Sequence, residues 1–246
     1  MMGYSKDLLV NKTILITGAG KGIGRACALL ASSLGAKVIA VARTQSDLDS
    51  LVEADAHIVG WPVDVNSAEF FLKVTELETI DGLINNVGIN RVAPMSEQSD
   101  DNIDSVIDMN IRSMYKVTKA LLPALSKSNS ASIVNMSSQM GFVGSPGRTL
   151  YCMSKHAVEG LTKSLAVEIA EQGIRVNSVA PTFVETPMTK PMLEDEAFRD
   201  FVFGMIPMKK LASTGDVANA CMFLLSNLSQ MITGSSIKID GGWTAQ

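Results

Sequence analysis

Short apolar segments alternate with longer segments of helical spacing along the whole chain, and this alternation constrains the fold more than any other feature. Near-continuous apolar strands separated by helices predict an α/β protein with a parallel sheet covered on both faces. Pro62 interrupts the third apolar segment, so we expect the last part of that strand to lie at an edge of the sheet or to leave the sheet already. The predicted strands, about seven in number, lie at 13–18, 37–42, 58–65, 81–88, 132–138, 174–181 and 235–242.

The segments between the strands show helical spacing or no clear pattern. No linker, repeat or low-complexity segment divides the chain, so residues 1–246 are predicted to form a single domain. The stretch 182–210 is predicted as an irregular substrate loop, either a mobile lid or helices packed on the core or a neighbouring subunit. Helices are expected from the apolar run that ends at Gly35, from a cap at Ser46, and over about 100–125, 150–172 and 215–225.

Composition excludes several classes of function. The formal net charge of −4 gives no basic footprint for nucleic acid. No apolar run reaches membrane-spanning length, and the N-terminal residues lack the apolar core of a signal peptide. The three cysteines and two histidines are scattered, so we expect no disulfide framework, no metal site and a cytoplasmic location.

A glycine-rich segment, TGAGKGIG at 17–24, follows the first strand and opens the next helix. Its glycines are spaced GxxxGxG, which differs from the GxGxxG fingerprint but permits the same tight turn and close approach to a pyrophosphate. The N-terminus of the following helix favours the negative charge. Any tight strand-to-helix turn uses glycine, but this position favours a dinucleotide site.

The second strand predicts which dinucleotide binds. NAD enzymes place a carboxylate near the end of this strand, whereas this chain has Arg43 and Thr44 there. A guanidinium can bind a 2′-phosphate through two hydrogen bonds, and Lys21 in the glycine loop would reach the same group. We therefore expect NADP(H); the alternative is that both cations are solvated surface charges.

Tyr151 and Lys155 lie one helical turn apart, just after the fifth strand. Ligands bind at the carboxyl ends of parallel strands, so this pair is placed near the cofactor. A free tyrosine has a pKa of about 10, and bringing it near 7 requires roughly 4 kcal/mol from the ammonium and the cofactor's positive ring. A phenol with such a pKa would act as a general acid or base.

Together with their neighbours, these motifs resemble the short-chain dehydrogenase/reductase family over about 12–243. The resemblance rests on TGAGKGIG, NNVG at 85–88, DMNI around Asn110, the serine pair at 137–138, YCMSK at 151–155 and AP at 180–181. It looks closest to the NADPH-dependent carbonyl and xylulose reductases. It implies a single-domain, Rossmann-like, doubly wound sheet of about seven parallel strands.

The resemblance also implies a catalytic tetrad. Ser138 would hydrogen-bond the substrate oxygen, and Tyr151 would be the acid or base. Lys155 would lower the pKa of Tyr151 and hold the nicotinamide ribose, and Asn110 would anchor a water that links Lys155 to solvent.

The same resemblance distributes the cofactor contacts. Adenine is expected near 64–65, the adenosine near Asn86, Gly88 and Ile111, and the carboxamide near 184–186. Two departures, Val87 for the usual alanine and Thr182 for the usual glycine, put the local geometry in question but not the chemistry. The full expected cofactor set is Gly18, Lys21, Gly22, Ile23, Gly24, Arg43, Thr44, Asp64, Val65, Asn86, Gly88, Ile111, Tyr151, Lys155, Pro181, Val184 and Thr186.

The substrate is only loosely constrained. Side chains that flank Ser138 and Tyr151 are expected to face it, and among them Arg148 would meet a carboxylate, a sugar hydroxyl or only solvent. The other expected substrate-facing residues are Gln139, Met140, Phe142 and Val143.

The leading hypothesis is hydride transfer between NADP(H) and a small ketone or secondary alcohol, such as a carbonyl compound, sugar or polyol. The alternatives are a 3-oxoacyl-carrier-protein reductase and a non-catalytic NADP-binding regulator. The family resemblance also implies a homotetramer.

Overall fold

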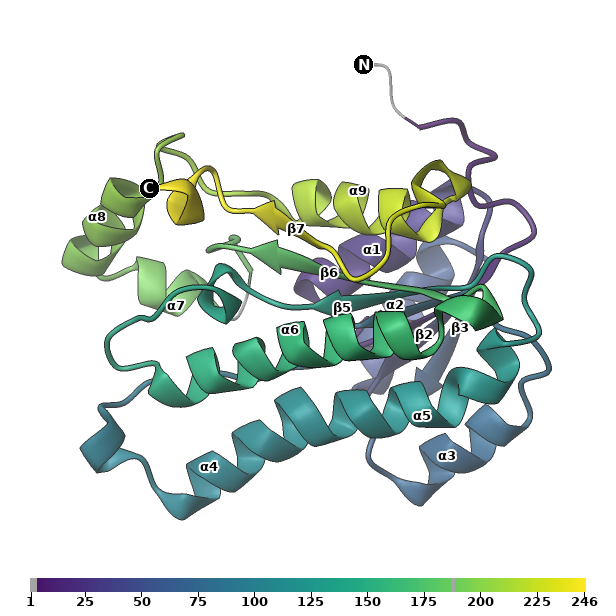
Figure 1. Ribbon diagram of the computed structural model, residues 1–246, viewed down its shortest axis with the longest axis horizontal. Coiled ribbons are helices and arrows are strands. Elements are labelled where there is room, and N and C mark those ends of the chain that lie inside the picture. The colour runs from purple at the N-terminus through teal and green to yellow at the C-terminus, as the bar shows by residue number, and fades with distance from the viewer. Residues whose placement is uncertain (1–3, 187–188) are drawn as a thin grey trace.

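The computed structural model describes residues 4–186 and 189–246. Seven parallel strands form one sheet in the order β3-β2-β1-β4-β5-β6-β7 (Figure 1). The predicted doubly wound parallel sheet is confirmed, and the strand that contains Pro62 lies at an edge as expected. The strands are β1 Thr13–Thr17, β2 Lys37–Ala42, β3 Ile58–Pro62, β4 Gly82–Asn85, β5 Ser132–Met136, β6 Arg175–Pro181 and β7 Ser236–Ile239.

Helices cover both faces of the sheet (Figure 1). Those in the described residues are α1 Gly22–Ser33, α2 Gln45–Ala54, α3 Ala68–Thr75, α4 Asp100–Ile107, α5 Ser113–Leu125, α6 Thr149–Glu168, α7 Lys190–Leu193, α8 Glu196–Met205 and α9 Thr214–Leu225. A π-helical turn, Asp108–Arg112, joins α4 to α5, and short 3₁₀ helices lie at Met95–Glu97, Gln139–Gly141, Ala170–Gln172, Asn227–Ser229 and Trp243–Ala245. Within the described part of the chain, no helix has the length and apolar character needed to cross a membrane.

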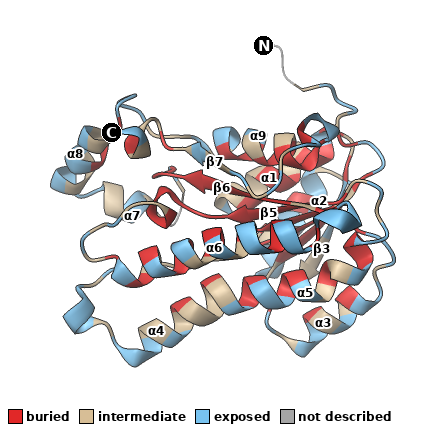
Figure 2. Ribbon diagram, in the orientation of Figure 1, coloured by how far each residue is buried: buried red, intermediate tan, exposed pale blue. Residues whose placement is uncertain are grey.

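Two apolar cores lie on opposite faces of the sheet, and the alternation of side chains along each strand divides them. On β1, Ile14 and Ile16 join the core shared with α1, α2 and α9, whereas Leu15 joins the core beneath α3, α5 and α6. Successive side chains of a strand point to opposite faces, so each central strand supplies both cores. Figure 2 shows the resulting burial of the sheet between its helical layers.

Several boundaries differ from the sequence-based expectations. The second helix begins at Gln45 after an extended Thr44, so Ser46 lies inside the helix and is not its cap. Helix α3 was not expected; the hydroxyl of Ser67 accepts a hydrogen bond from the amide of Phe70 and stabilises its start. The expected single helix over 100–125 is interrupted by the π-helical turn.

The stretch 182–210, predicted as an irregular loop, contains two helices. The carboxylate of Asp195 caps α8 by accepting a hydrogen bond from the amide of Phe198, and Val202 on α8 is fully buried. A third apolar cluster holds Val202 and Ile206 together with Met140 and Trp243 from distant parts of the chain. Of the two alternatives left open, packing on the core therefore describes α8; positions 187 and 188 lie outside the described residues.

Candidate active site

The carboxyl ends of the parallel strands meet at one edge of the sheet, and most of the predicted site residues lie there. The glycine loop follows β1, Gly88 lies beyond β4, Ser138 beyond β5 and Val184 beyond β6. Because parallel strands share one direction, residues far apart in the sequence converge at this edge.

The backbone of the glycine loop favours glycine at two positions and leaves no room for a Cβ at a third. Gly18 and Gly22 have φ angles of +67° and +56°, in the left-handed region. A Cβ on Gly24 would lie 2.2 Å from the carbonyl oxygen of Gly18, so α1 begins in direct contact with the loop. At Gly22 an added Cβ would lie 3.5 Å from Thr186, which places the segment after β6 opposite the loop. These features fit a cradle for a dinucleotide pyrophosphate, with Ile23 in the first turn of α1.

Asn86 supports this loop from the next strand. Its side-chain amide donates hydrogen bonds to the carbonyls of Thr17 and Gly18, both at 3.1 Å. Its backbone amide also donates to the hydroxyl of Thr17 at 3.0 Å. The side chain expected at the adenosine ribose thus holds the shape of the glycine loop, a role that sequence spacing did not reveal.

The cations expected at the 2′-phosphate differ in their surroundings. Arg43 and Thr44 are exposed at the end of β2. The ammonium of Lys21 lies 3.3 Å from the carboxylate of Asp47 on α2, a partner not foreseen from the sequence. Within the described residues, Arg43 forms no ion pair, so its guanidinium is free to meet a phosphate at the end of β2.

The remaining expected cofactor residues border the same edge. Asp64 follows β3 and accepts a hydrogen bond from the amide of Asn66, while Val65 is buried in the core under α3. Ile111 lies in the π-helical turn, half-buried. Pro181 is the last residue of β6, Val184 is buried beside Ala212, and Thr186 bonds to Thr189.

Asn110 is fully buried in the π-helical turn, and its side chain ties three segments together. Its amide donates to the carbonyl of Ile89 at 2.9 Å and to the hydroxyl of Ser154 at 3.0 Å, and its oxygen accepts from the amide of Ile89 at 2.8 Å. A Cβ on Gly88 would lie 3.4 Å from this oxygen and 3.7 Å from the ammonium of Lys155. Both N–H groups of Asn110 are thus used by the protein, so the water expected at Asn110 would bond to one of its oxygen atoms.

Tyr151 and Lys155 lie on α6 as predicted, but the ammonium is not directed at the phenolic oxygen. It donates a hydrogen bond of 2.8 Å to the carbonyl of Met136 and lies 5.6 Å from the centre of the tyrosine ring. Burial lowers the pKa of Lys155 to about 8, although the nearby charge of Glu159 acts in the opposite direction.

Burial raises the pKa of Tyr151 to about 12, while hydrogen bonding with Ser138 and the charge of Arg148 oppose this rise. With Lys155 alone in place the pKa of Tyr151 is raised, so the expected shift toward 7 depends on the positive ring of the cofactor, which the sequence-based hypothesis also invoked. The physical reason is that desolvation penalises the phenolate more than the neighbouring groups stabilise it. At neutral pH the tyrosine carries its proton, which suits a group that donates to a carbonyl oxygen.

Ser138 lies beside the phenol at the start of a short 3₁₀ helix. Its hydroxyl accepts a hydrogen bond from the amide of Met140 at 3.2 Å and donates to the side-chain oxygen of Gln139 at 2.8 Å. Gln139 is itself buried, so the orientation of the serine hydroxyl is fixed by its sequence neighbour.

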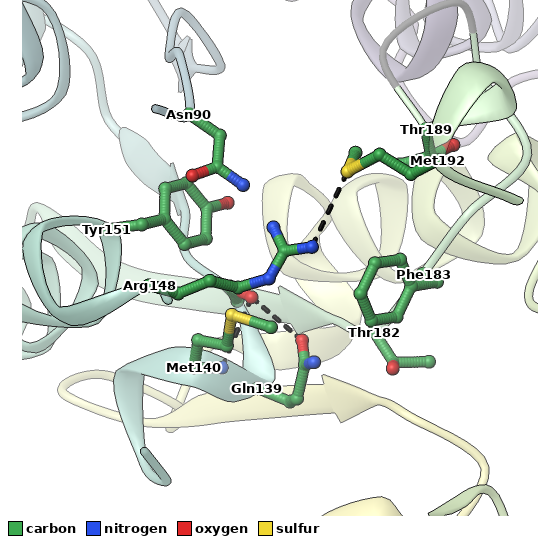
Figure 3. Close-up of a pocket in the computed structure, with 10 residues that line it drawn as sticks. Asn90, Gln139, Met140, Arg148, Tyr151, Thr182, Phe183, Thr189 and Met192 are labelled. Atoms are coloured by element: carbon green, nitrogen blue, oxygen red, sulfur yellow. Dashed lines mark hydrogen bonds between the residues drawn. The ribbon is translucent and has the colours of Figure 1, made fainter. Parts of the chain in front are cut away.

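A cavity opens beside Tyr151, with an empty volume of about 360 Å³ that includes the part open to solvent (Figure 3). The sequence predicted that Gln139, Met140 and Arg148 would face it, and they do. Phe142 and Val143 do not line this cavity. Its other lining residues come from the segments that follow β4, β5 and β6, from α6 and from the region of α7. Ser138 and Tyr151 were predicted at the site, whereas the others were not foreseen as lining residues: Asn90, Thr182, Phe183, Thr189 and Met192.

The chain is similar to known proteins over most of its length. A family model described as enoyl-(acyl carrier protein) reductase matches residues 18–244. A 3-oxoacyl-[acyl-carrier-protein] reductase of Thermotoga maritima is 39% identical over 243 residues, which are 95% of this chain and 98% of that protein. The chain belongs to the short-chain dehydrogenase/reductase family.

Two further relatives illustrate the range of this family. An L-xylulose reductase of Mus musculus is 36% identical over 241 residues, 96% of this chain and 98% of that protein. The solved structure of a protein of Beutenbergia cavernae, described as an NAD(P)-dependent gluconate 5-dehydrogenase with bound NADP, has a TM-score of 0.92. It is 31% identical and covers 98% of this chain and 100% of that chain. The protein is therefore an oxidoreductase enzyme, as the sequence predicted.

The raised pKa of Tyr151 is testable by ultraviolet titration, since the chain has three tyrosines. The difference between the titration curves of the wild type and Tyr151→Phe gives the ionisation of Tyr151. Its midpoint should lie near pH 12, because burial disfavours the phenolate and raises the pKa of Tyr151. Tyr115→Phe removes an exposed phenol and serves as the control. A Tyr151 midpoint near 7 in the protein without cofactor would show that burial does not control the ionisation of this phenol.

Proposed function

We propose that the protein transfers hydride between NADP(H) and a small ketone or secondary alcohol, with Tyr151 as the acid or base. The observation that carries this proposal is the convergence of Tyr151 and Ser138 on one cavity, with Lys155 behind the tyrosine ring and the glycine cradle at the same sheet edge. Small carbonyl compounds, sugars and polyols match the size of this cavity.

Each side chain has a distinct task in this mechanism. In reduction, the phenolic oxygen of Tyr151 gives its proton to the carbonyl oxygen, while the hydroxyl of Ser138 turns from Gln139 and donates its hydrogen bond to that oxygen. The ammonium of Lys155, held by the carbonyl of Met136, places a positive charge close to the phenolate that results. When bound, the dinucleotide supplies or accepts the hydride, and its oxidised ring adds a further positive charge near the phenol.

The surroundings of Arg43 support NADP(H) over NAD(H). Its guanidinium is exposed at the end of β2, where an NAD enzyme has a carboxylate. The Beutenbergia cavernae relative, solved with NADP, supports the same choice. Lys21 would reach a 2′-phosphate only by leaving Asp47, so we assign the main contact to Arg43.

Replacing Arg43 tests this assignment. Arg43→Ala should lower kcat/KM with NADPH by about 10- to 100-fold and leave kcat/KM with NADH almost unchanged, because only NADPH carries the phosphate. Lys37→Ala, at the other end of the same strand, is the matched control and should change neither value. Equal use of both cofactors by the wild type would refute the preference.

Two other functions remain as competitors. The Thermotoga maritima relative favours 3-oxoacyl-carrier-protein reduction, which requires a basic patch for an acidic carrier. The ammonium of Lys209 is bonded to the carbonyls of Phe203 and Gly204, and the chain is acidic, so little supports such a patch. A non-catalytic NADP-binding regulator would have no need of a buried lysine behind a tyrosine, since burying an ammonium costs free energy.

The role of Tyr151 separates an enzyme from such a regulator. Tyr151→Phe should lower kcat by about 10²- to 10⁴-fold because it removes the transferable proton, while the dissociation constant for NADPH stays within threefold. Tyr115→Phe, which alters an exposed phenol on α5, should leave both quantities unchanged. Carbonyl reduction by Tyr151→Phe at half the wild-type rate or more would contradict the mechanism.

We also propose a homotetramer in the cytoplasm. Exposed apolar side chains on α5 and α6 support an assembly through these helices, namely Tyr115, Met153 and Val167. The cysteines at positions 27, 152 and 221 are free and buried, which suits a reducing compartment. Size-exclusion chromatography with light scattering should give four times the chain mass of 26.2 kDa, and a stable monomer would contradict the assembly.

A further inference from the structure

Arg148 is a buried cation that the proposed mechanism does not use. It precedes α6 by one residue and is only 4% exposed. No ion pair joins it to a carboxylate anywhere in the described residues. Burial lowers the pKa of this guanidinium, and the groups whose charge opposes the shift are Tyr151 and Cys152. An unpaired buried charge is costly, so a partner from outside the chain is the expected compensation.

Among the described residues, a single side-chain hydrogen bond uses the guanidinium of Arg148. A guanidinium has five N–H donors in a planar fork. Its side-chain hydrogen bond runs from Nη2 to the thioether sulfur of Met192 at 3.5 Å, and sulfur is a weak acceptor. Figure 3 shows the guanidinium among the residues that line the cavity, between Tyr151 and Met192.

Aromatic rings flank this guanidinium but do not replace an anion. Its central carbon lies 5.6 Å from the centre of the Phe183 ring and 5.5 Å from that of Phe198. Cation–π contacts use the face of a guanidinium and leave the N–H groups along its edge available. The rings therefore hold Arg148 in place and exclude water from it, which strengthens any ionic bond formed there.

The same cavity holds three more polar atoms without a partner. Among the described residues, the buried atoms that lack a hydrogen bond include Oδ1 of Asn90, Nε2 of Gln139 and Oγ1 of Thr182, and all three residues line this cavity. Orphaned buried donors and acceptors cost about 1–3 kcal/mol each, so they mark places for ligand groups. Oδ1 of Asn90 is an acceptor, Nε2 of Gln139 is a donor, and the hydroxyl of Thr182 can act as either. A ligand that carries several hydroxyl groups could bond to all three.

We infer that Arg148 binds a carboxylate of the substrate, and that the substrate is a short hydroxylated oxo-acid or the matching hydroxy acid. This inference rests on the proposed reductase function, because the reacting carbonyl must lie at Tyr151. Arg148 and Tyr151 line the same cavity, so the carboxylate and the ketone are placed on one small molecule. A thioester of a carrier protein offers no anion beside its ketone and would leave Arg148 unpaired.

Matched substrate pairs test the inference. NADP⁺ reduction is measured with sugar acids of four to six carbons in both enantiomeric series, each against the polyol that has CH₂OH in place of the carboxylate, for example D-gluconate against D-glucitol. At least one acid should show a kcat/KM about 100-fold above that of its polyol. Arg148→Met should lower kcat/KM for that acid about 100-fold and leave kcat/KM for the polyol within threefold of the wild type. Arg148→Lys, which keeps a positive charge, should lower kcat/KM for the acid less than Arg148→Met does.

The inference would be overturned if every polyol had a kcat/KM equal to or above that of its acid. It would also be overturned if Arg148→Met lowered kcat/KM equally for both members of a pair. Reduction of diacetyl without turnover of any acid would also overturn it and leave the proposed reductase function standing. If the wild-type protein turned over none of the carbonyl compounds or alcohols tested, the proposed function itself would be overturned.

A stability measurement separates binding from a structural role. Without substrate, the melting temperature of Arg148→Met should equal or exceed that of the wild type, because the change removes an unpaired buried charge. Arg199→Gln, at a partly exposed arginine on α8, is the control and should change little. A fall of several degrees in Arg148→Met alone would show that the arginine serves the packing of Phe183 and Phe198, and would overturn the inference.

Discussion

The side-chain amide of Asn110 is the contact on which the arrangement of the site depends. It lies in the π-helical turn between α4 and α5 and bonds both to the backbone of Ile89 beyond β4 and to Ser154 on α6. The loop beyond β4 contains Gly88, at which an added Cβ would lie close to both Asn110 and Lys155. Helix α6 carries Tyr151. A buried amide with all of its donors satisfied rigidifies its surroundings, so the spacing between the loop beyond β4 and α6 is set by hydrogen bonds and not by apolar packing alone.

Desolvation governs the chemistry of this site. It raises the pKa of Tyr151 and lowers that of Lys155, so each group is pushed toward its neutral form. The ammonium of Lys155 donates a hydrogen bond to a backbone carbonyl. Among the described residues, the guanidinium of Arg148 contacts a thioether sulfur and two aromatic rings but no oxygen acceptor. The two buried cations therefore differ in what they require. Lys155 is satisfied by the protein and stabilises charge that develops on the tyrosine, while Arg148 requires an anion that arrives with a ligand.

The sequence predicts the sheet well because the pattern of a parallel strand is local. Apolar runs between helices, with Pro62 in the third, indicate seven strands and one edge, and the structure has them. Directions of side chains depend on tertiary contacts, and here the sequence is a poorer guide. The spacing of Tyr151 and Lys155 does not show that the ammonium turns to Met136. Nothing near Asn86 in the sequence shows that its amide supports the glycine loop. For 182–210 the sequence left a packed helix pair as only one alternative, because α7 is a single turn of four residues, although α8 is amphipathic.

The two walls of the cavity explain why the reaction class is readable from the chain while the substrate is not. Ser138 and Tyr151 come from the end of β5 and from α6, elements fixed by the sheet and by Asn110. Thr189 and Met192 come from the segment after β6, where Phe198 of α8 also packs against Phe183. Proton transfer needs only the first wall, whose motifs recur across the family. Substrate specificity depends on the segment after β6 together with Arg148. The guanidinium there discriminates between ligands first by their charge and only then by their shape. The charge of the ligand is thus the property that this structure constrains most strongly, because Arg148 lines the cavity beside Tyr151.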